Sequence, residues 1–284
     1  MYYHFLGNYL FPSHDPHAQT PTNTKTPTFT PTQTSTSAIQ TDLLAYWDAG
    51  NTSSYPGSGN TLSDLTSNNY DLTLNNVTFN SSGIKYFDFN GSNSYASYTD
   101  SIFKDASNDN LTIILWVQWS GSSGINPNFL LSDMATSGSR SVSVTMNNGN
   151  YEAYVRQGSN VSNVGTAAPT NTWEQIAFTY NTSSGTKLYG NADLDDSSST
   201  TVPTLDLANH SLFNIGRQAI GDRYFNGKIA IIKIYDGTLS ETEIEESYSA
   251  LRQRFSLPQL KREWLDKSKV GTVVELLSSK SALP

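Results

Sequence analysis

The sequence predicts an all-β protein, in which two antiparallel sheets pack face to face, an extended arm precedes them and one helix follows. Aromatic residues make up 12% of the 284 residues, with 16 tyrosines among them, and aromatic side chains favour the pleated surface of a sheet. Between residues 42 and 235, short runs of β-forming residues alternate with turns rich in Gly, Asn, Ser and Asp. About nine or more strands at such spacing are typical of a two-sheet sandwich.

The clearest predicted strand is Leu111–Trp119, LTIILWVQW. Its odd-numbered residues are apolar on one face, and Ile114 and Trp116 lie on the other, as in a central strand that is covered on both sides. In the strictly alternating run Arg140–Met146, we expect the valines and the methionine to face inward and the Ser and Thr residues to face outward. The other strands are predicted at Trp173–Tyr180 and Lys228–Tyr235 and, from weaker patterns, at Leu43–Trp47, Lys85–Phe89, Tyr151–Gln157, Thr186–Gly190 and Leu212–Gly216.

A single helix is predicted after the last strand. Ser240 with Glu243 three residues later forms a capping box, and further glutamates in the first turns complement the positive end of the helix dipole. Apolar residues then recur at helical spacing, so one face of the helix should pack on the sandwich. These residues are Ile244, Tyr248, Leu251 and Phe255.

Composition and charge exclude several classes of function. The formal net charge of −8 and the scarcity of clustered Lys and Arg argue against nucleic acid as a partner. The absence of cysteine excludes disulfides, thiol catalysis and thiolate metal sites. Three of the four histidines lie within the first 17 residues, so His210 is the only one left for the body of the protein. No run approaches the roughly 20 apolar residues of a membrane span.

The N-terminal 41 residues divide into an anchor and an arm. Residues 1–19 begin with the apolar and aromatic stretch MYYHFLGNYLF, which we expect to anchor the chain to a support; the alternative is a cleaved secretion signal. Residues 20–41 carry Thr at every even position from 20 to 36, with three prolines between them, which favours an extended spacer. A disordered linker is the simpler interpretation of the same composition.

The body and the C-terminal tail differ in charge. The body, residues 42–255, holds 11 basic and 21 acidic residues, whereas the tail, residues 256–284, holds five basic and three acidic residues. Apolar residues recur in the tail at helical spacing. The tail is therefore expected either to dock on an acidic neighbour or a second copy, or to pack back on its own domain.

Several stretches together resemble the laminin G-like, concanavalin A-like lectin/glucanase jelly roll, in the version found in phage and viral structural proteins. The resemblance implies a two-sheet jelly roll that is closed by a terminal helix and serves as a carbohydrate-binding or adhesive module. It covers roughly 215 residues and leaves both ends of the chain unmatched. The stretches are Leu43–Leu74, Tyr86–Ser97, Leu111–Trp119, Trp173–Asn181, Phe213–Arg217 and Phe225–Phe255.

The acidic residues do not form the pattern of a retaining glycosidase, which needs two carboxyl groups about 5 to 5.5 Å apart. The E-x-D-x-x-E arrangement of the enzymatic relatives is absent, and Asp88, Glu152 and Glu174 stand alone on their predicted strands. We therefore expect no enzymatic activity and no required cofactor. The Ser-rich segment NADLDDSSS could hold a calcium ion through Asp193, Asp195 and Asp196, although a solvated acidic loop is the simpler interpretation.

Sugar binding in a sandwich combines an aromatic platform with amide, carboxylate or guanidinium groups. Three segments have these residue types, SSYPGSG, YEAYVR and GDRYF, whereas Trp116 and Trp173 fit the core better than a platform. The candidate glycan-binding residues are Tyr55, Tyr151, Tyr154, Arg156, Asp222, Arg223 and Tyr224.

These features lead to one functional expectation with two alternatives. We expect a non-enzymatic structural or decoration protein on a virion surface, a spike or fibre component, which displays a lectin-like domain to host glycans. Its partners should be other proteins of the same assembly, reached through the anchor and the tail, and repeated copies of the chain itself. The first alternative is a secreted or cell-surface lectin, and the second is an enzyme similar to a glycoside hydrolase.

Overall fold

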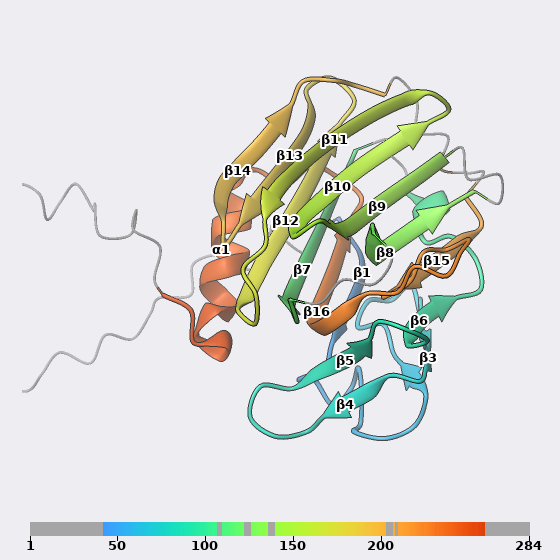
Figure 1. Cartoon of the computed structure of the whole chain (residues 1–284), viewed down its shortest axis with the longest axis vertical. Coiled ribbons are helices and arrows are strands. Elements are labelled where there is room, and N and C mark those ends of the chain that lie inside the picture. The colour runs from blue at the N-terminus through green and yellow to red at the C-terminus, as the bar shows by residue number, and fades with distance from the viewer. Residues whose placement is uncertain are drawn as a thin grey trace, which may run out of the picture. The chain divides into compact units, whose positions relative to one another are not determined.

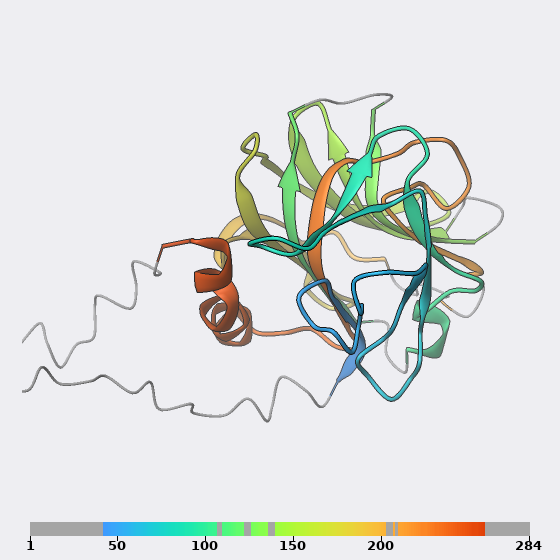
Figure 2. The ribbon, with the colours of Figure 1, turned by 90° about the horizontal axis from the view of Figure 1, so that it is seen from below.

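The computed structural model describes residues 42–106, 110–121, 126–135, 140–202, 207 and 210–258. The predicted anchor, the Thr/Pro arm and residues 259–284 of the tail lie outside this part. The described residues form two eight-stranded antiparallel sheets, which we call sheet A and sheet B, and one α-helix (Figures 1 and 2). The predicted all-β sandwich with a C-terminal helix is therefore confirmed. Within this part of the chain, no helix is long and apolar enough to cross a membrane.

Sheet A has the strand order β14-β13-β12-β7-β16-β5-β4, and β1 also pairs with β16. The central position of β7 agrees with the prediction from its two apolar faces. The strands are β14 (Asp193–Ser198), β13 (Gly185–Gly190), β12 (Trp173–Asn181), β7 (Leu111–Trp119), β16 (Asn226–Tyr235), β5 (Tyr86–Asn90), β4 (Thr78–Asn80) and β1 (Leu43–Asp48).

Sheet B has the strand order β11-β10-β9-β8-β15-β6-β3-β2. In Figure 1, β11, β10, β9 and β8 run side by side across the front of the sandwich. The strands are β11 (Asn160–Ala167), β10 (Asn150–Gln157), β9 (Arg140–Asn147), β8 (Asn128–Met134), β15 (Leu212–Ile215), β6 (Tyr95–Tyr98), β3 (Leu72–Asn75) and β2 (Thr61–Leu62).

The space between the sheets is filled by the inward faces of their strands. Leu111, Ile113 and Leu115 of β7 pack there with the valines of β9, while Ile114 and Trp116 face the other way, into a second apolar cluster on the outside of sheet A. Both faces of β7 are thus buried as predicted.

The helix α1 (Glu241–Leu251) and the 3-10 turn η4 (Arg252–Phe255) cover this outer face of sheet A. The capping box is present, because the Ser240 hydroxyl accepts from the backbone N–H of Glu243 and the Glu243 carboxylate accepts from the N–H of Ser240. Buried residues of the helix belong to the second apolar cluster, so one helix face packs on the sandwich, as the helical spacing of its apolar residues predicts.

Candidate functional site

The outer face of sheet B is polar around β10. Side chains alternate along a strand, so Asn150, Glu152, Tyr154 and Arg156 share the outer side, whereas Tyr151 points into the core. On β9, the outer side carries Ser141, Ser143 and Thr145, and on β11 it carries Asn163 and Gly165. We call the outer side of β9, β10 and β11 the polar face.

The serine and threonine hydroxyls of β9 lie on the outer side, as predicted, but almost none of their surface is exposed. Tyr154 of β10 lies beside Ser141 and Ser143. Segment 217–224, which connects β15 to β16, covers the neighbouring strand β8, where the backbone N–H of Ala219 donates to Ser132 at 3.2 Å. The hydroxyls are therefore the buried base of the polar face, and the larger side chains beside them are more exposed to solvent.

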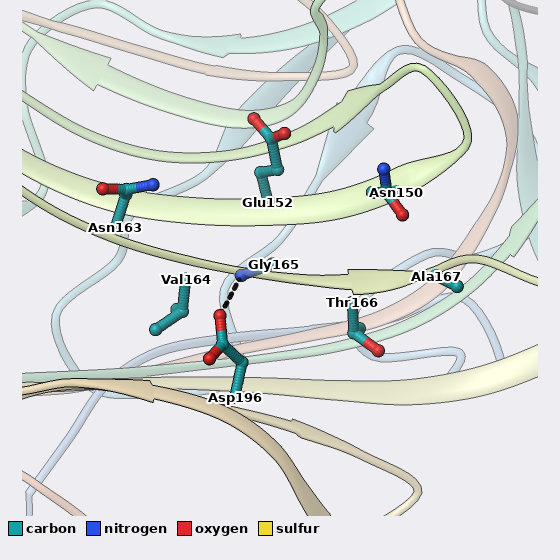
Figure 3. A pocket seen from close by; sticks show the side chains of 8 residues that line it. All are labelled: Asn150, Glu152, Asn163, Val164, Gly165, Thr166, Ala167 and Asp196. Carbon is teal, nitrogen blue, oxygen red and sulfur yellow. Dashed lines mark hydrogen bonds between the residues drawn. The ribbon is translucent and has the colours of Figure 1, made fainter.

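A pocket of about 370 Å³ opens at one end of the polar face (Figure 3). It lies where Gly165 stands opposite Glu152 in the pairing of β11 with β10. A Cβ atom added to Gly165 would lie 3.3 Å from Cγ of Glu152, so the missing side chain helps to leave the hollow. The lining residues are Asn150, Glu152, Asn163, Val164, Gly165, Thr166, Ala167 and Asp196.

Hydrogen bonds fix the two acids of this pocket. The Nδ2 amide of Asn147 donates to both carboxylate oxygens of Glu152, at 3.2 Å each. Asp196 reaches from β14 of sheet A and accepts from the backbone N–H of Gly165 at 2.9 Å, which Figure 3 marks. Glu152 therefore offers oriented acceptors, and the amides of Asn150 and Asn163 can both donate and accept. Such a set suits the hydroxyls of a sugar.

Tyr154 lies further along the polar face, where the charges of two arginines act on it. Burial raises the pKa of the Tyr154 phenol, while the hydroxyls of Ser143 and Ser141 and the charges of Arg156 and Arg223 act in the opposite direction. Arg223 is held in place because its Nη1 donates to the backbone carbonyl of Asn126 at 2.7 Å. Tyr154 thus presents an aromatic ring in a positively charged environment.

Segment 217–224 adds a second aromatic group. The guanidinium of Arg217 lies over the rings of Tyr95 and Tyr224, 4.8 and 5.5 Å from their centroids, and its Nε donates to the carbonyl of Gly221 at 2.9 Å. Asp222 is exposed and lies 3.8 Å from Arg217. The predicted residues Asp222, Arg223 and Tyr224 therefore sit beside β8, on the same side of sheet B as Tyr154.

Two of the predicted glycan-binding residues lie elsewhere. Tyr55 packs edge-on against Phe79 and Phe87 in the core, and its hydroxyl donates to the carbonyl of Gly59 at 2.9 Å. Tyr151 is fully buried between the sheets. Neither ring is available as a platform on the polar face.

The acidic segment around Asp195 forms a strand, which corrects the expectation of a loop. Asp193 and Asp196 belong to β14, which pairs with β13, and a bulge accommodates Asp195. Charged residues on such an edge strand oppose pairing with another chain. Among the residues that the structure describes, no three His, Asp or Glu side chains are grouped so that they could hold a metal ion.

Glu174 lies close to this acidic edge. It shares the inward side of β12 with Ile176 and Phe178, and burial, followed by the charge of Asp195, raises its pKa to about 8. The two carboxyl groups come from different strands, which the sequence pattern does not reveal. Glu174 does not line the pocket in Figure 3.

We expect the stability of the protein to fall as the pH rises from about 4.5 to 8, in part because of Glu174. The folded state keeps the proton of Glu174 up to a pKa of about 8, whereas the unfolded chain releases it near 4.5, so the folded state binds more protons in this window. Urea unfolding of the Glu174→Gln variant should show a smaller loss of stability over the same window. The exposed Glu246→Gln is the control, and equal slopes in the wild type and both variants would contradict this assignment.

Several residues on the outer side of sheet B are not recognisable as site residues from the sequence alone. The sequence shows Glu152 only as an isolated acid, and it does not single out Asn163, Gly165 or Arg217. The available signal is the period of two in YEAYVR, which separates Tyr151 from Glu152, Tyr154 and Arg156. Asn163 and Gly165 of β11 and Arg217 carry no such local signal.

Comparisons with known proteins agree with this architecture. A family model described as the concanavalin A-like lectin/glucanases superfamily matches residues 90–245. No curated protein sequence matches the chain.

Among solved structures, the binding domain of botulinum neurotoxin serotype D/C has a TM-score of 0.60 and 16% sequence identity, over 75% of this chain and 53% of the other. The chain thus spans about half the length of that domain. Domain 4 of AbnA, a GH43 extracellular arabinanase from Geobacillus stearothermophilus, has a TM-score of 0.58 and 21% identity. The match covers 72% of this chain and 97% of that domain, which was solved in complex with arabinotriose. At these identities the likeness shows a shared fold.

Proposed function

This chain belongs to the concanavalin A-like lectin/glucanases superfamily, and we propose that the polar face of its sheet B binds glycans. The observation that carries the proposal is the row of Glu152, Tyr154 and Arg156 on the outer side of β10, next to the pocket at Gly165. This row combines hydrogen-bond acceptors, an aromatic ring and a cation within one strand. The fold neighbour AbnA domain 4 was solved with arabinotriose, which supports a carbohydrate as the ligand class.

The Tyr154→Ala variant is expected to lose glycan binding by at least about tenfold. Losing the contact of an aromatic platform costs about 1.5–3 kcal/mol when the ring is covered by ligand. A glycan array of the full-length chain should first identify a ligand, and titration calorimetry should then compare the variants. Asn163→Ala is expected to lower the affinity for the same ligand, because it removes an amide at the pocket.

Tyr86→Ala serves as the matched control for Tyr154→Ala. Tyr86 is a half-buried tyrosine on the outer side of sheet A, where it packs against Trp173. Its removal should leave glycan affinity unchanged. Equal losses in both variants, or no binding to any glycan by the wild type, would overturn the proposed site.

We also propose that the domain binds without catalysis. Glu174 belongs to the interior strand β12 and Asp195 to the edge strand β14, and Glu174 is not among the residues that line the pocket. Release of reducing ends from a polysaccharide panel, at a rate that Glu174→Gln lowers, would instead support a glycoside hydrolase.

The finer proposal concerns where the domain is displayed. We infer that it is a decoration, spike or fibre component of a virion, in which residues 1–19 anchor the chain and the Thr/Pro arm holds the glycan-binding domain outward. The composition of the first 41 residues supports this inference. Normal incorporation into particles of a chain that lacks residues 1–40 would refute the anchor and favour a secreted or cell-surface lectin.

A further inference from the structure

Arg156 lies on the outer side of β10, at the end of the polar face away from the pocket. Its side chain is exposed, and its cross-strand neighbours are the uncharged Ser141 of β9 and Val161 of β11. Among the residues that the structure describes, none forms an ion pair or hydrogen bond with its guanidinium. The planar guanidinium is therefore free to bind a carboxylate or sulfate in a two-pronged geometry.

Three other arginines of the described residues have partners. Arg217 lies over the rings of Tyr95 and Tyr224, Arg223 donates to Asn126, and Arg254 donates to both carboxylate oxygens of Asp48 at 2.7 and 2.9 Å. The body as a whole has 11 basic and 21 acidic residues. A free arginine next to the half-buried Tyr154 is thus a local positive site on an acidic domain.

The two ends of the polar face have opposite charge. Glu152 accepts from Asn147 at the pocket end, and Arg156 lies four residues further along β10, a distance of about 13 Å for an extended strand. This distance exceeds the width of one pyranose ring. A ligand that reaches both ends must therefore be an oligosaccharide, with hydroxyl groups toward Glu152 and any anionic group toward Arg156.

We propose that the polar face selects acidic oligosaccharides, whose carboxylate or sulfate group binds Arg156 while a neutral sugar occupies the pocket at Glu152. This inference rests on the proposed glycan binding and names its ligand class. Arg156 is the specificity-determining residue, Tyr154 supplies the ring between the two subsites, and the charge of Arg223 adds positive potential at Tyr154.

The test compares matched neutral and acidic oligosaccharides with the full-length chain. The probes are lactose, its 3′-sialylated form and its 3′-sulfated form, together with trimers of galactose and galacturonate. In at least one pair, we expect the acidic member to bind about tenfold or more tightly than the neutral member. This ratio of affinities should decrease as the salt concentration is raised. The sialylated and sulfated arms distinguish a carboxylate from a sulfate as the bound group.

Arg156→Gln should reduce the ratio of acidic to neutral affinity to about one, and Arg156→Lys should restore part of that ratio. Lys187→Gln, which removes one positive charge from sheet A, is the matched control. Equal binding of neutral and acidic probes by the wild type, or a preference that Arg156→Gln leaves intact, would overturn the inference while glycan binding stands. Binding of no glycan at all would overturn both.

Discussion

Replacing Phe255 with alanine is expected to lower the free energy of unfolding by about 3–5 kcal/mol. The ring of Phe255 stacks on Trp116 with a centroid distance of 4.2 Å and contacts Trp173 at 5.0 Å, on the outside of sheet A. It is almost completely buried, although it lies near the end of the described chain. The variant removes the contact that closes the second apolar cluster, so it should also expose Trp116 to solvent.

Urea unfolding followed by tryptophan fluorescence measures this loss. Gln253→Ala changes an exposed residue of the same turn, η4, and should stay within about 0.5 kcal/mol of the wild type. If Phe255→Ala were as stable as Gln253→Ala, the terminal helix would not be an integral part of the sandwich.

The second large effect is expected at Asp133, whose carboxylate lies fully buried between the sheets. It accepts from the Ser101 hydroxyl, at 2.9 and 2.8 Å to its two oxygens, and it contacts Nδ1 of His210. Burial raises the pKa of Asp133, and the hydrogen bond from His210 opposes that shift. Asp133→Ala leaves two buried polar partners without an acceptor, which is expected to cost about 3–5 kcal/mol in the free energy of unfolding.

A double variant separates the loss of pairing from the loss of packing. If unpaired polar groups cause the instability, replacing both partners by apolar residues in Asp133→Leu with His210→Phe should recover part of the stability of Asp133→Ala. Asp42→Asn, at an exposed position, is the control and should be close to neutral. A double variant that is less stable than Asp133→Ala would argue against this explanation.

Elements with strong local patterns could be predicted from the sequence. The prediction of β7 depends only on its own nine residues, because apolar side chains occupy both faces of the strand. The helix start is equally local, because Ser240 and Glu243 bond to each other's backbone groups within one turn. The sequence pattern does not predict the short strands β2, β3, β4 and β6, nor β8, β11 and β14. The polar composition of β11 and β14 resembles that of loops, and they become strands through pairing with their neighbours.

Local patterns in the sequence are enough to predict the sandwich class, the central strand, the capped helix and the residue types of the proposed glycan-binding face. Which of those residues meet depends on the fold, which buries Tyr55 and Tyr151, leaves Tyr154 and Arg156 on one face, and brings Asp196 from sheet A to Gly165 of sheet B. The physical reason is that alternation fixes the two sides of one strand, whereas contacts between strands depend on pairing across long stretches of chain. Such pairing is stabilised by the whole sandwich, so the sequence next to the site does not indicate it.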